Sequence, residues 1–163
     1  SAAGMDRGRA LAGLTLKWPN DLLWSGRKIA GVLCESAPRP GRQGVVLAGV
    51  GMDVNSTSFP PEIEGIATSL RLIAGREVER EHALACALSG IESAASLYAR
   101  EGLAAFREEW IGRCSLWGRP CTAGGVGGTM ETLDEAGGLV LRLGSGGTVA
   151  VTSGPVEMAA IRG

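Results

Sequence analysis

The spacing of apolar residues changes twice along the chain, and each change predicts a different kind of structure. Up to about residue 54, short apolar runs separated by Gly, Pro or polar pairs predict strands at 14–17, 22–24, 28–35 and 45–54. From 78 to about 114, apolar residues recur at helical spacing, with a second amphipathic stretch after Gly102. Past Trp117, glycines separate short strand-like segments at 139–143, 148–152 and 156–161.

This pattern predicts an α+β protein with two domains. Several early strands are continuous apolar runs, so we expect a mixed or antiparallel sheet with one face covered by helices, over residues 1–116. Residues 117–163 are expected to form a small, tightly curved β-barrel that turns at its glycines. Because the first strand begins almost at once, we expect the first domain to lack its N-terminal half.

Composition narrows the classes of function. The net charge of −1 offers no basic field for nucleic acid, and no apolar run is long enough to cross a membrane. With no signal-peptide pattern, a cytoplasmic protein is expected. The four cysteines form no CxxC pair and His82 is the single histidine, so no metal site is expected.

Lysine is rare and confined to one region. Fourteen residues are arginine and two are lysine, Lys17 and Lys28, which lie within twelve residues of each other. A compact ammonium on a flexible stem fits a crowded pocket where the planar guanidinium fork does not. The alternative is a pair of solvated lysines on a β-hairpin.

Four segments together resemble the motifs of one enzyme family. In order, they are KWPNDLL (17–23), GRKIAGVLCE (26–35), GVGMDVN (49–55) and TSL (68–70). They resemble the catalytic domain of biotin protein ligases, which join biotin to a lysine of a biotin carboxyl carrier protein through biotinyl-5′-AMP. The resemblance implies a class II synthetase-like domain followed by an SH3-like barrel, with biotin, ATP and accompanying Mg²⁺ as substrates.

Lys17 is the candidate catalytic residue. Forming an acyl-adenylate brings a carboxylate up to a polyphosphate, and an ammonium between the two anions screens their repulsion as charge builds at the α-phosphorus. Lys17 ends a strand and precedes a turn made rigid by proline. The resemblance implies the same role, with Lys17 touching the biotin carboxyl group and the adenylate phosphate.

The remaining candidates are expected to bind substrate or nucleotide. Lys28 is placed on the return strand of the hairpin, from which it reaches ATP phosphates or solvent. Glycines in strands let a ligand approach the backbone closely, or mark β-bulges. The resemblance implies that GVGMDVN lines the biotin and adenine sites, with Asp53 where the family usually has Asn. The full set of binding candidates is Lys17, Lys28, Leu22, Gly31, Gly49, Gly51, Asp53 and Asn55.

One expected motif is absent. Biotin protein ligases carry an Arg/Gly-rich loop, GRGRxGRxW, well upstream of KWPND, whereas this chain has only Arg7-Gly8-Arg9 close to the first strand. Two alternatives to a biotin ligase therefore stay open: a lipoate or octanoate ligase or transferase, and a non-catalytic fragment or binding module. An exposed sheet edge also makes a homodimer an expectation.

Overall fold

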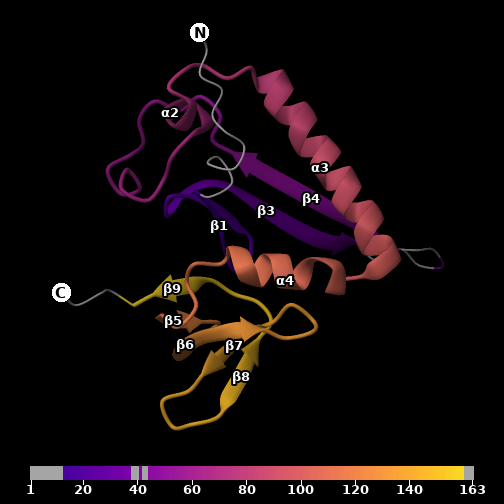
Figure 1. Ribbon diagram of the computed structural model, residues 1–163, viewed down its shortest axis with the longest axis vertical. Helices are drawn as coiled ribbons and strands as arrows, with labels where there is room; N and C mark the ends of the chain where they lie inside the picture. Colours follow the sequence, from indigo (N-terminus) through magenta and orange to yellow (C-terminus); the bar gives the residue numbers. More distant parts are fainter. Residues whose placement is uncertain (1–12, 38–40, 42–43, 160–163) are drawn as a thin grey trace. The chain divides into compact units, whose positions relative to one another are not determined.

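The computed structural model describes residues 13–37, 41 and 44–159. The first sheet has strand order β1-β2-β3-β4, from Leu14–Lys17, Asp21–Trp24, Arg27–Ala37 and Val45–Met52. Strands β2, β3 and β4 pair antiparallel, and β3 and β4 are the long neighbouring arrows of Figure 1. The four strands predicted in this part of the sequence are therefore confirmed. Arg7-Gly8-Arg9 lies outside the described residues.

The β2–β3 hairpin contains a two-residue turn and a β-bulge. Ser25 and Gly26 both have positive φ, at 48° and 80°, as a type I′ turn requires. Between Leu22 and Leu23 the register shifts, because β3 inserts Ile29 as an extra residue. A bulge of this kind reverses the alternation of faces along the strand, and thereby decides which side chains share a face.

Three helices follow the first sheet. Helix α2, Leu70–Ala74, is capped by Ser69, whose hydroxyl accepts from the Leu72 amide at 3.1 Å. Helix α3 spans Arg80–Glu101 and helix α4 spans Ala104–Arg113, as the helical spacing predicts. Gly102, with φ of 67°, ends α3 in the left-handed conformation.

A second, antiparallel sheet has strand order β8-β7-β6-β5-β9. Its strands are Pro120–Ala123, Val126–Leu133, Leu139–Arg142, Thr148–Val151 and Val156–Met158. The sequence predicted the last three strands but missed β5 and β6, where four glycines at 124, 125, 127 and 128 hide the apolar alternation. The α+β class is confirmed; closure of this sheet into a barrel stays a prediction.

Contacts divide the chain into two units. Among the described residues, the first unit contains 13–15 together with those between 20 and 84, and the second contains 16–19 together with 85–159. The second unit has a core of buried side chains from β5 to β9, joined by Leu116 and by Trp18 from the KWPND motif. The expected boundary near residue 116 differs from this division, because α4 and Trp18 belong to the same unit as the second sheet.

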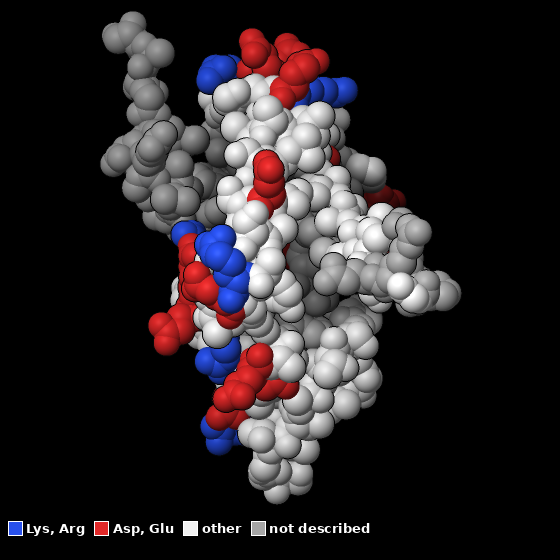
Figure 2. All heavy atoms as spheres, turned by 90° about the vertical axis from the view of Figure 1, so that its right-hand side faces the viewer, with Lys and Arg blue, Asp and Glu red and all other residues white. Residues whose placement is uncertain are grey.

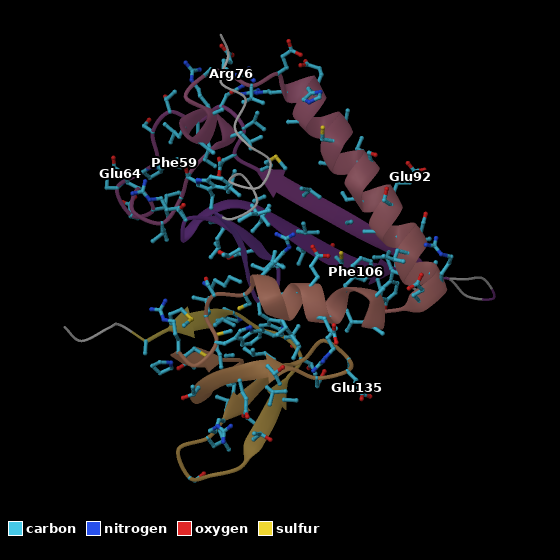
Figure 3. The ribbon with its side chains drawn as sticks, viewed as in Figure 1. Phe59, Glu64, Arg76, Glu92, Phe106 and Glu135 are labelled. Atoms are coloured by element: carbon cyan, nitrogen blue, oxygen red, sulfur yellow. The ribbon has the colours of Figure 1, made fainter. Side chains whose placement is uncertain are left out.

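Charged residues of both signs are mixed over the face shown in Figure 2. Glu92 on α3 and Glu135 after β6, labelled in Figure 3, are exposed carboxylates. Among the described residues, no helix is both long and apolar enough to span a membrane.

Candidate functional site

A pocket of about 630 Å³ lies on the first sheet, within the first contact unit. Its floor is made by glycines that face one another across β3 and β4. Gly31 is paired with Gly51, and Gly49 is paired with Leu33 two rungs further along the ladder. Because these three glycines carry no side chain, a flat ligand can lie directly on the backbone. The lining residues are Asn20, Lys28, Ala30, Gly31, Leu33, Gly49, Val50, Gly51, Met52 and Asp53.

Lys28 reaches this floor because of the β-bulge. Residues three apart on a regular strand point to opposite faces, but the extra residue at Ile29 puts Lys28 and Gly31 on one face. Asp21 pairs with Gly31 across the ladder and shares that face. The Lys28 Nζ lies 2.5 Å from the Asp21 Oδ1, and a methyl group on Gly31 would lie only 3.2 Å from that Nζ.

The Lys28–Asp21 ion pair holds a cation beside the glycine floor. The Lys28 side chain is 50% exposed and the Asp21 side chain 17%, so solvent still reaches the ammonium. The Lys28 backbone is fixed on its other side, donating to Ile66 at 2.7 Å and accepting from Thr68 at 2.8 Å. The stem therefore starts from a fixed point, and the ammonium can act on an anion in the pocket.

Asp53 is one of the residues that line the pocket. Its backbone amide donates to Ile29 at 2.9 Å and its carbonyl accepts from Leu70 at 2.9 Å. The Ser56 hydroxyl donates to the Asp53 Oδ1 at 3.2 Å. An ionised carboxylate only accepts hydrogen bonds, so Asp53 offers acceptors to donor groups of a ligand.

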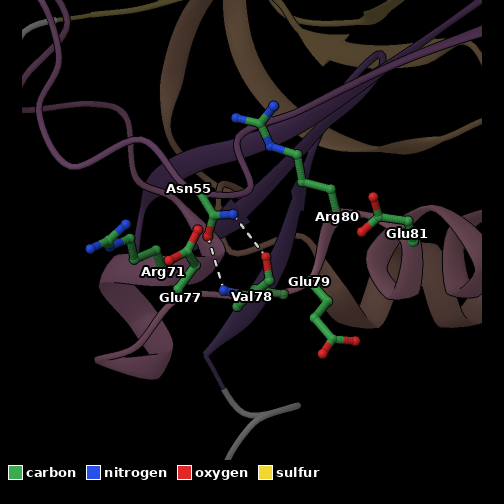
Figure 4. A pocket seen from close by; sticks show the side chains of 7 residues that line it. All are labelled: Asn55, Arg71, Glu77, Val78, Glu79, Arg80 and Glu81. Carbon is green, nitrogen blue, oxygen red and sulfur yellow. Dashed lines mark hydrogen bonds between the residues drawn. The ribbon is translucent and has the colours of Figure 1, made fainter.

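Asn55 points elsewhere, into a neighbouring hollow shown in Figure 4. Its side-chain amide donates to the Val78 carbonyl at 2.8 Å and accepts from the Val78 amide at 3.0 Å. Both ends of the amide are thereby used to tie the segment after β4 to the residues before α3. The hollow, of about 610 Å³, is lined mainly by charged side chains: Arg71, Glu77, Glu79, Arg80 and Glu81.

Five of the predicted site residues therefore line the pocket: Lys28, Gly31, Gly49, Gly51 and Asp53. Leu22 is half-buried on β2 opposite Ala30 and is not a lining residue. Lys17 is half-buried at the end of β1 and belongs to the second contact unit. The catalytic role of Lys17 and the binding roles of the others stay predictions.

The ion pair between Asp21 and Lys28 was not predicted from the sequence. A signal was present in the sequence: in a two-residue hairpin Lys28 pairs with Leu23, and Asp21 lies two positions from Leu23 and so shares its face. Among the described residues, no three His, Cys, Asp or Glu side chains gather as metal ligands. The Asp21 carboxylate is engaged by the Lys28 ammonium.

The chain is similar to known proteins over much of its length. Residues 4–53 match the biotin/lipoate A/B protein ligase family. A biotin–[acetyl-CoA-carboxylase] ligase of Paracoccus denitrificans is 34% identical over 152 residues, which are 86% of this chain and 61% of that protein. The bifunctional ligase/repressor BirA of Bacillus subtilis is 40% identical over 77 residues, or 44% of this chain and 24% of that protein.

The fold has a solved counterpart. The apo structure of biotin protein ligase from Aquifex aeolicus matches with a TM-score of 0.75 and 26% identity, covering 90% of this chain and 65% of that chain. The same Aquifex protein has been solved in complex with biotin and ATP, with a TM-score of 0.75. The chain therefore spans less than two thirds of these relatives.

These findings first show an α+β fold similar to that of the biotin/lipoate protein ligases. Within that class, the resemblance to biotin protein ligases that the motifs indicate is confirmed by the Paracoccus and Aquifex relatives.

Proposed function

We propose that this chain is part of a biotin–protein ligase that activates biotin with ATP and transfers it to a carrier lysine. The observation that carries the proposal is the glycine floor of Gly31, Gly49 and Gly51 beside the Lys28 ammonium. A flat, mostly apolar ring system can lie on such a floor, while the cation at its side attracts a phosphate or carboxylate. The relatives named as biotin ligases support the same substrates.

The first half-reaction joins two anions. A biotin carboxylate oxygen attacks the α-phosphorus of ATP, the bond to the β-phosphate oxygen breaks, and pyrophosphate leaves with its Mg²⁺. Lys17 is the residue whose ammonium is proposed to screen the carboxylate from the α-phosphate, since it ends a strand before the Trp18-Pro19 turn. Lys28 is assigned to the ATP phosphates, and Asp53 to donor groups of the base.

In the second half-reaction a lysine amine of the carrier protein attacks the acyl carbonyl of biotinyl-5′-AMP. The acyl–oxygen bond breaks, AMP leaves, and the amine loses a proton as the amide forms. The partner is a biotin carboxyl carrier protein domain, and a cytoplasmic location goes with the use of ATP. Leu22 is retained as a wall of the acyl site, and Asn55 as a support of the segment after Asp53.

Self-association through the first sheet is a further part of the proposal. In the described sheet β4 is an edge strand, and Val46 and Leu47 on it are 66% and 58% exposed. An exposed apolar edge strand favours pairing with another chain. A second copy of this chain is the partner expected from the sequence.

A calorimetric titration with a non-hydrolysable biotinyl-adenylate analogue tests the assignment. Gly51 has no atom within 4 Å of an added Cβ, so Gly51→Val should fill the pocket without a clash inside the protein. We expect the chain to bind the analogue and Gly51→Val not to bind it. Gly127→Val is the matched control, because Gly127 is likewise an uncrowded strand glycine but lies on β6.

An octanoyl-adenylate analogue separates the two ligase classes in the same titration. Selective binding of the biotinyl analogue supports the biotin ligase, whereas selective binding of the octanoyl analogue would replace it by the lipoate-type alternative. If neither analogue binds the chain, the pocket is not a ligand site by itself and the non-catalytic alternative is correct for this chain.

A further inference from the structure

Trp18, the residue after Lys17, is buried in the second unit although it comes from the KWPND motif near the start of the chain. Its side chain is 5% exposed and packs in the core cluster that includes Met130, Leu139 and Leu141. Its indole Nε1 donates to the Gly137 carbonyl at 3.0 Å, across 119 positions of sequence. The core of the C-terminal sheet therefore holds a residue covalently attached to Lys17.

The acceptor of this hydrogen bond is itself fixed. Gly137 lies in the turn between β6 and β7, with φ of 86°. The Asp134 carboxylate accepts from the amides of Ala136 at 2.9 Å and Gly138 at 2.7 Å, and so closes the turn. Added side-chain atoms at Gly137 would meet Leu103 of the same unit at 3.0 Å, so the turn packs tightly there.

Helix α4 forms hydrogen bonds to the same turn. The Arg107 guanidinium donates to the Asp134 carbonyl at 3.2 Å and also to the Leu133 carbonyl. Hydrogen bonds from a charged donor are stronger than neutral ones, and two of them from one planar group fix an orientation. Hydrogen bonds therefore connect Arg107 to the turn between β6 and β7, and the Gly137 carbonyl of that turn to Trp18.

Fixing Trp18 fixes the backbone of Lys17. Trp18 lies in the turn directly after β1, so its fixed position holds the end of the strand from which the Lys17 stem leaves. The lysine stem is long and flexible, and a reacting ammonium must be held to within about an ångström to be effective. The sequence offered no sign of this, because a tryptophan after a strand predicts only generic packing.

We propose that Trp18 is a positioning residue for Lys17, so that the C-terminal domain takes part in biotin activation by holding the catalytic lysine in place. This inference rests on the proposed function, in which Lys17 is the catalytic ammonium. In this proposal the C-terminal sheet contributes to catalysis without contacting the substrate.

The test uses the two lysines of the chain as reporters. With ¹³C-lysine labelling, the NMR spectrum contains signals from only Lys17 and Lys28, and Lys28→Arg identifies them. Trp18→Phe keeps most of the buried volume but removes the indole N–H. Trp117→Phe is the matched control, because the Trp117 Nε1 also donates to a backbone carbonyl of this unit, that of Ile111 at 2.8 Å.

We expect Trp18→Phe to shift the Lys17 signal and leave the Lys28 signal in place, while Trp117→Phe moves neither. Arg107→Gln, which loosens the turn without entering the core, should shift the Lys17 signal in the same direction by a smaller amount. If Trp18→Phe leaves Lys17 unmoved, or both tryptophan variants move it equally, Trp18 is only a core residue and the inference is wrong.

Kinetics of biotin-dependent ATP–pyrophosphate exchange give the second readout. Misplacing a catalytic group by about an ångström costs up to about a hundredfold in rate, so Trp18→Phe should lower kcat by about tenfold or more with little change in KM. An unchanged kcat would contradict the inference. If Lys17→Arg retains full activity, the proposed function of Lys17 fails, whereas the lysine spectrum still decides whether Trp18 positions it.

Discussion

Replacing Gly31 by alanine should separate the stability of the fold from its affinity for nucleotide. The added methyl group would lie 3.2 Å from the Lys28 Nζ, 3.3 Å from its Cε and 3.5 Å from the Asp21 Oδ1. Of these neighbours, the lysine end is flexible and half exposed, so it will move aside and leave Asp21. The predicted change is a displaced ammonium within an intact sheet.

The expected effect of Gly31→Ala on the free energy of unfolding is smaller than its effect on the affinity for nucleotide. Loss of an exposed ion pair costs about 0.2–1 kcal/mol, and alanine in a strand recovers about 0.5–1 kcal/mol relative to glycine. The free energy of unfolding in urea should therefore change by less than about 1 kcal/mol. A charged hydrogen bond to a phosphate contributes about 1.5–3 kcal/mol, so affinity for the adenylate analogue should fall by about tenfold to a hundredfold.

A double-mutant cycle tests whether the effect passes through Lys28. If it does, Gly31→Ala should cost little further affinity when Lys28 is already alanine. Gly49→Ala is the control for simple filling of the pocket, since its methyl group would meet only the Leu33 carbonyl, at 3.8 Å. Equal losses with and without Lys28, or equal losses for the two glycine variants, would refute the reasoning.

Three further predictions concern the groups that support the fold. Asn55→Ala should lower the free energy of unfolding by about 1–3 kcal/mol in urea titrations, because both backbone groups of its partner lose hydrogen bonds. Arg107→Ala should lower the Tm more than Arg107→Lys, which retains one charged donor. Burial raises the pKa of the Cys114 thiol, so it should react with a disulfide reagent far more slowly than exposed Cys34. Since the folded state then keeps its thiol proton longer, the free energy of unfolding should fall as pH rises above about 9, in pH-dependent urea titrations.

Local chemistry made much of the first sheet predictable. The Ser25-Gly26 turn, the flanking apolar runs and the glycines of β3 and β4 are all signals carried by neighbouring residues. Helices α3 and α4 follow from their spacing, with Gly102 between them. The pocket floor was therefore expected before its geometry was known.

Features that depend on distant or irregular pairing were not predictable. The bulge at Ile29 decides that Lys28 and Gly31 share a face, and no local signal in the sequence marks it. Asn55 was predicted to bind nucleotide, but its amide is matched to the backbone of Val78, twenty-three positions away. The burial of Trp18 against the C-terminal sheet depends on a partner 119 positions away.

The exposure of the Lys28–Asp21 pair bears on how the pocket can work. A fully buried ion pair would hold the ammonium too tightly, because breaking it would leave an uncompensated buried charge. At 50% exposure of the lysine, solvent lowers the strength of the pair to about 1 kcal/mol or less. A polyphosphate carries several negative charges against the single charge of Asp21, and it can therefore replace Asp21 as the partner of the Lys28 ammonium. Asp21 thus orients Lys28 above the glycine floor, and its carboxylate is compatible with the anion-binding role proposed for this pocket.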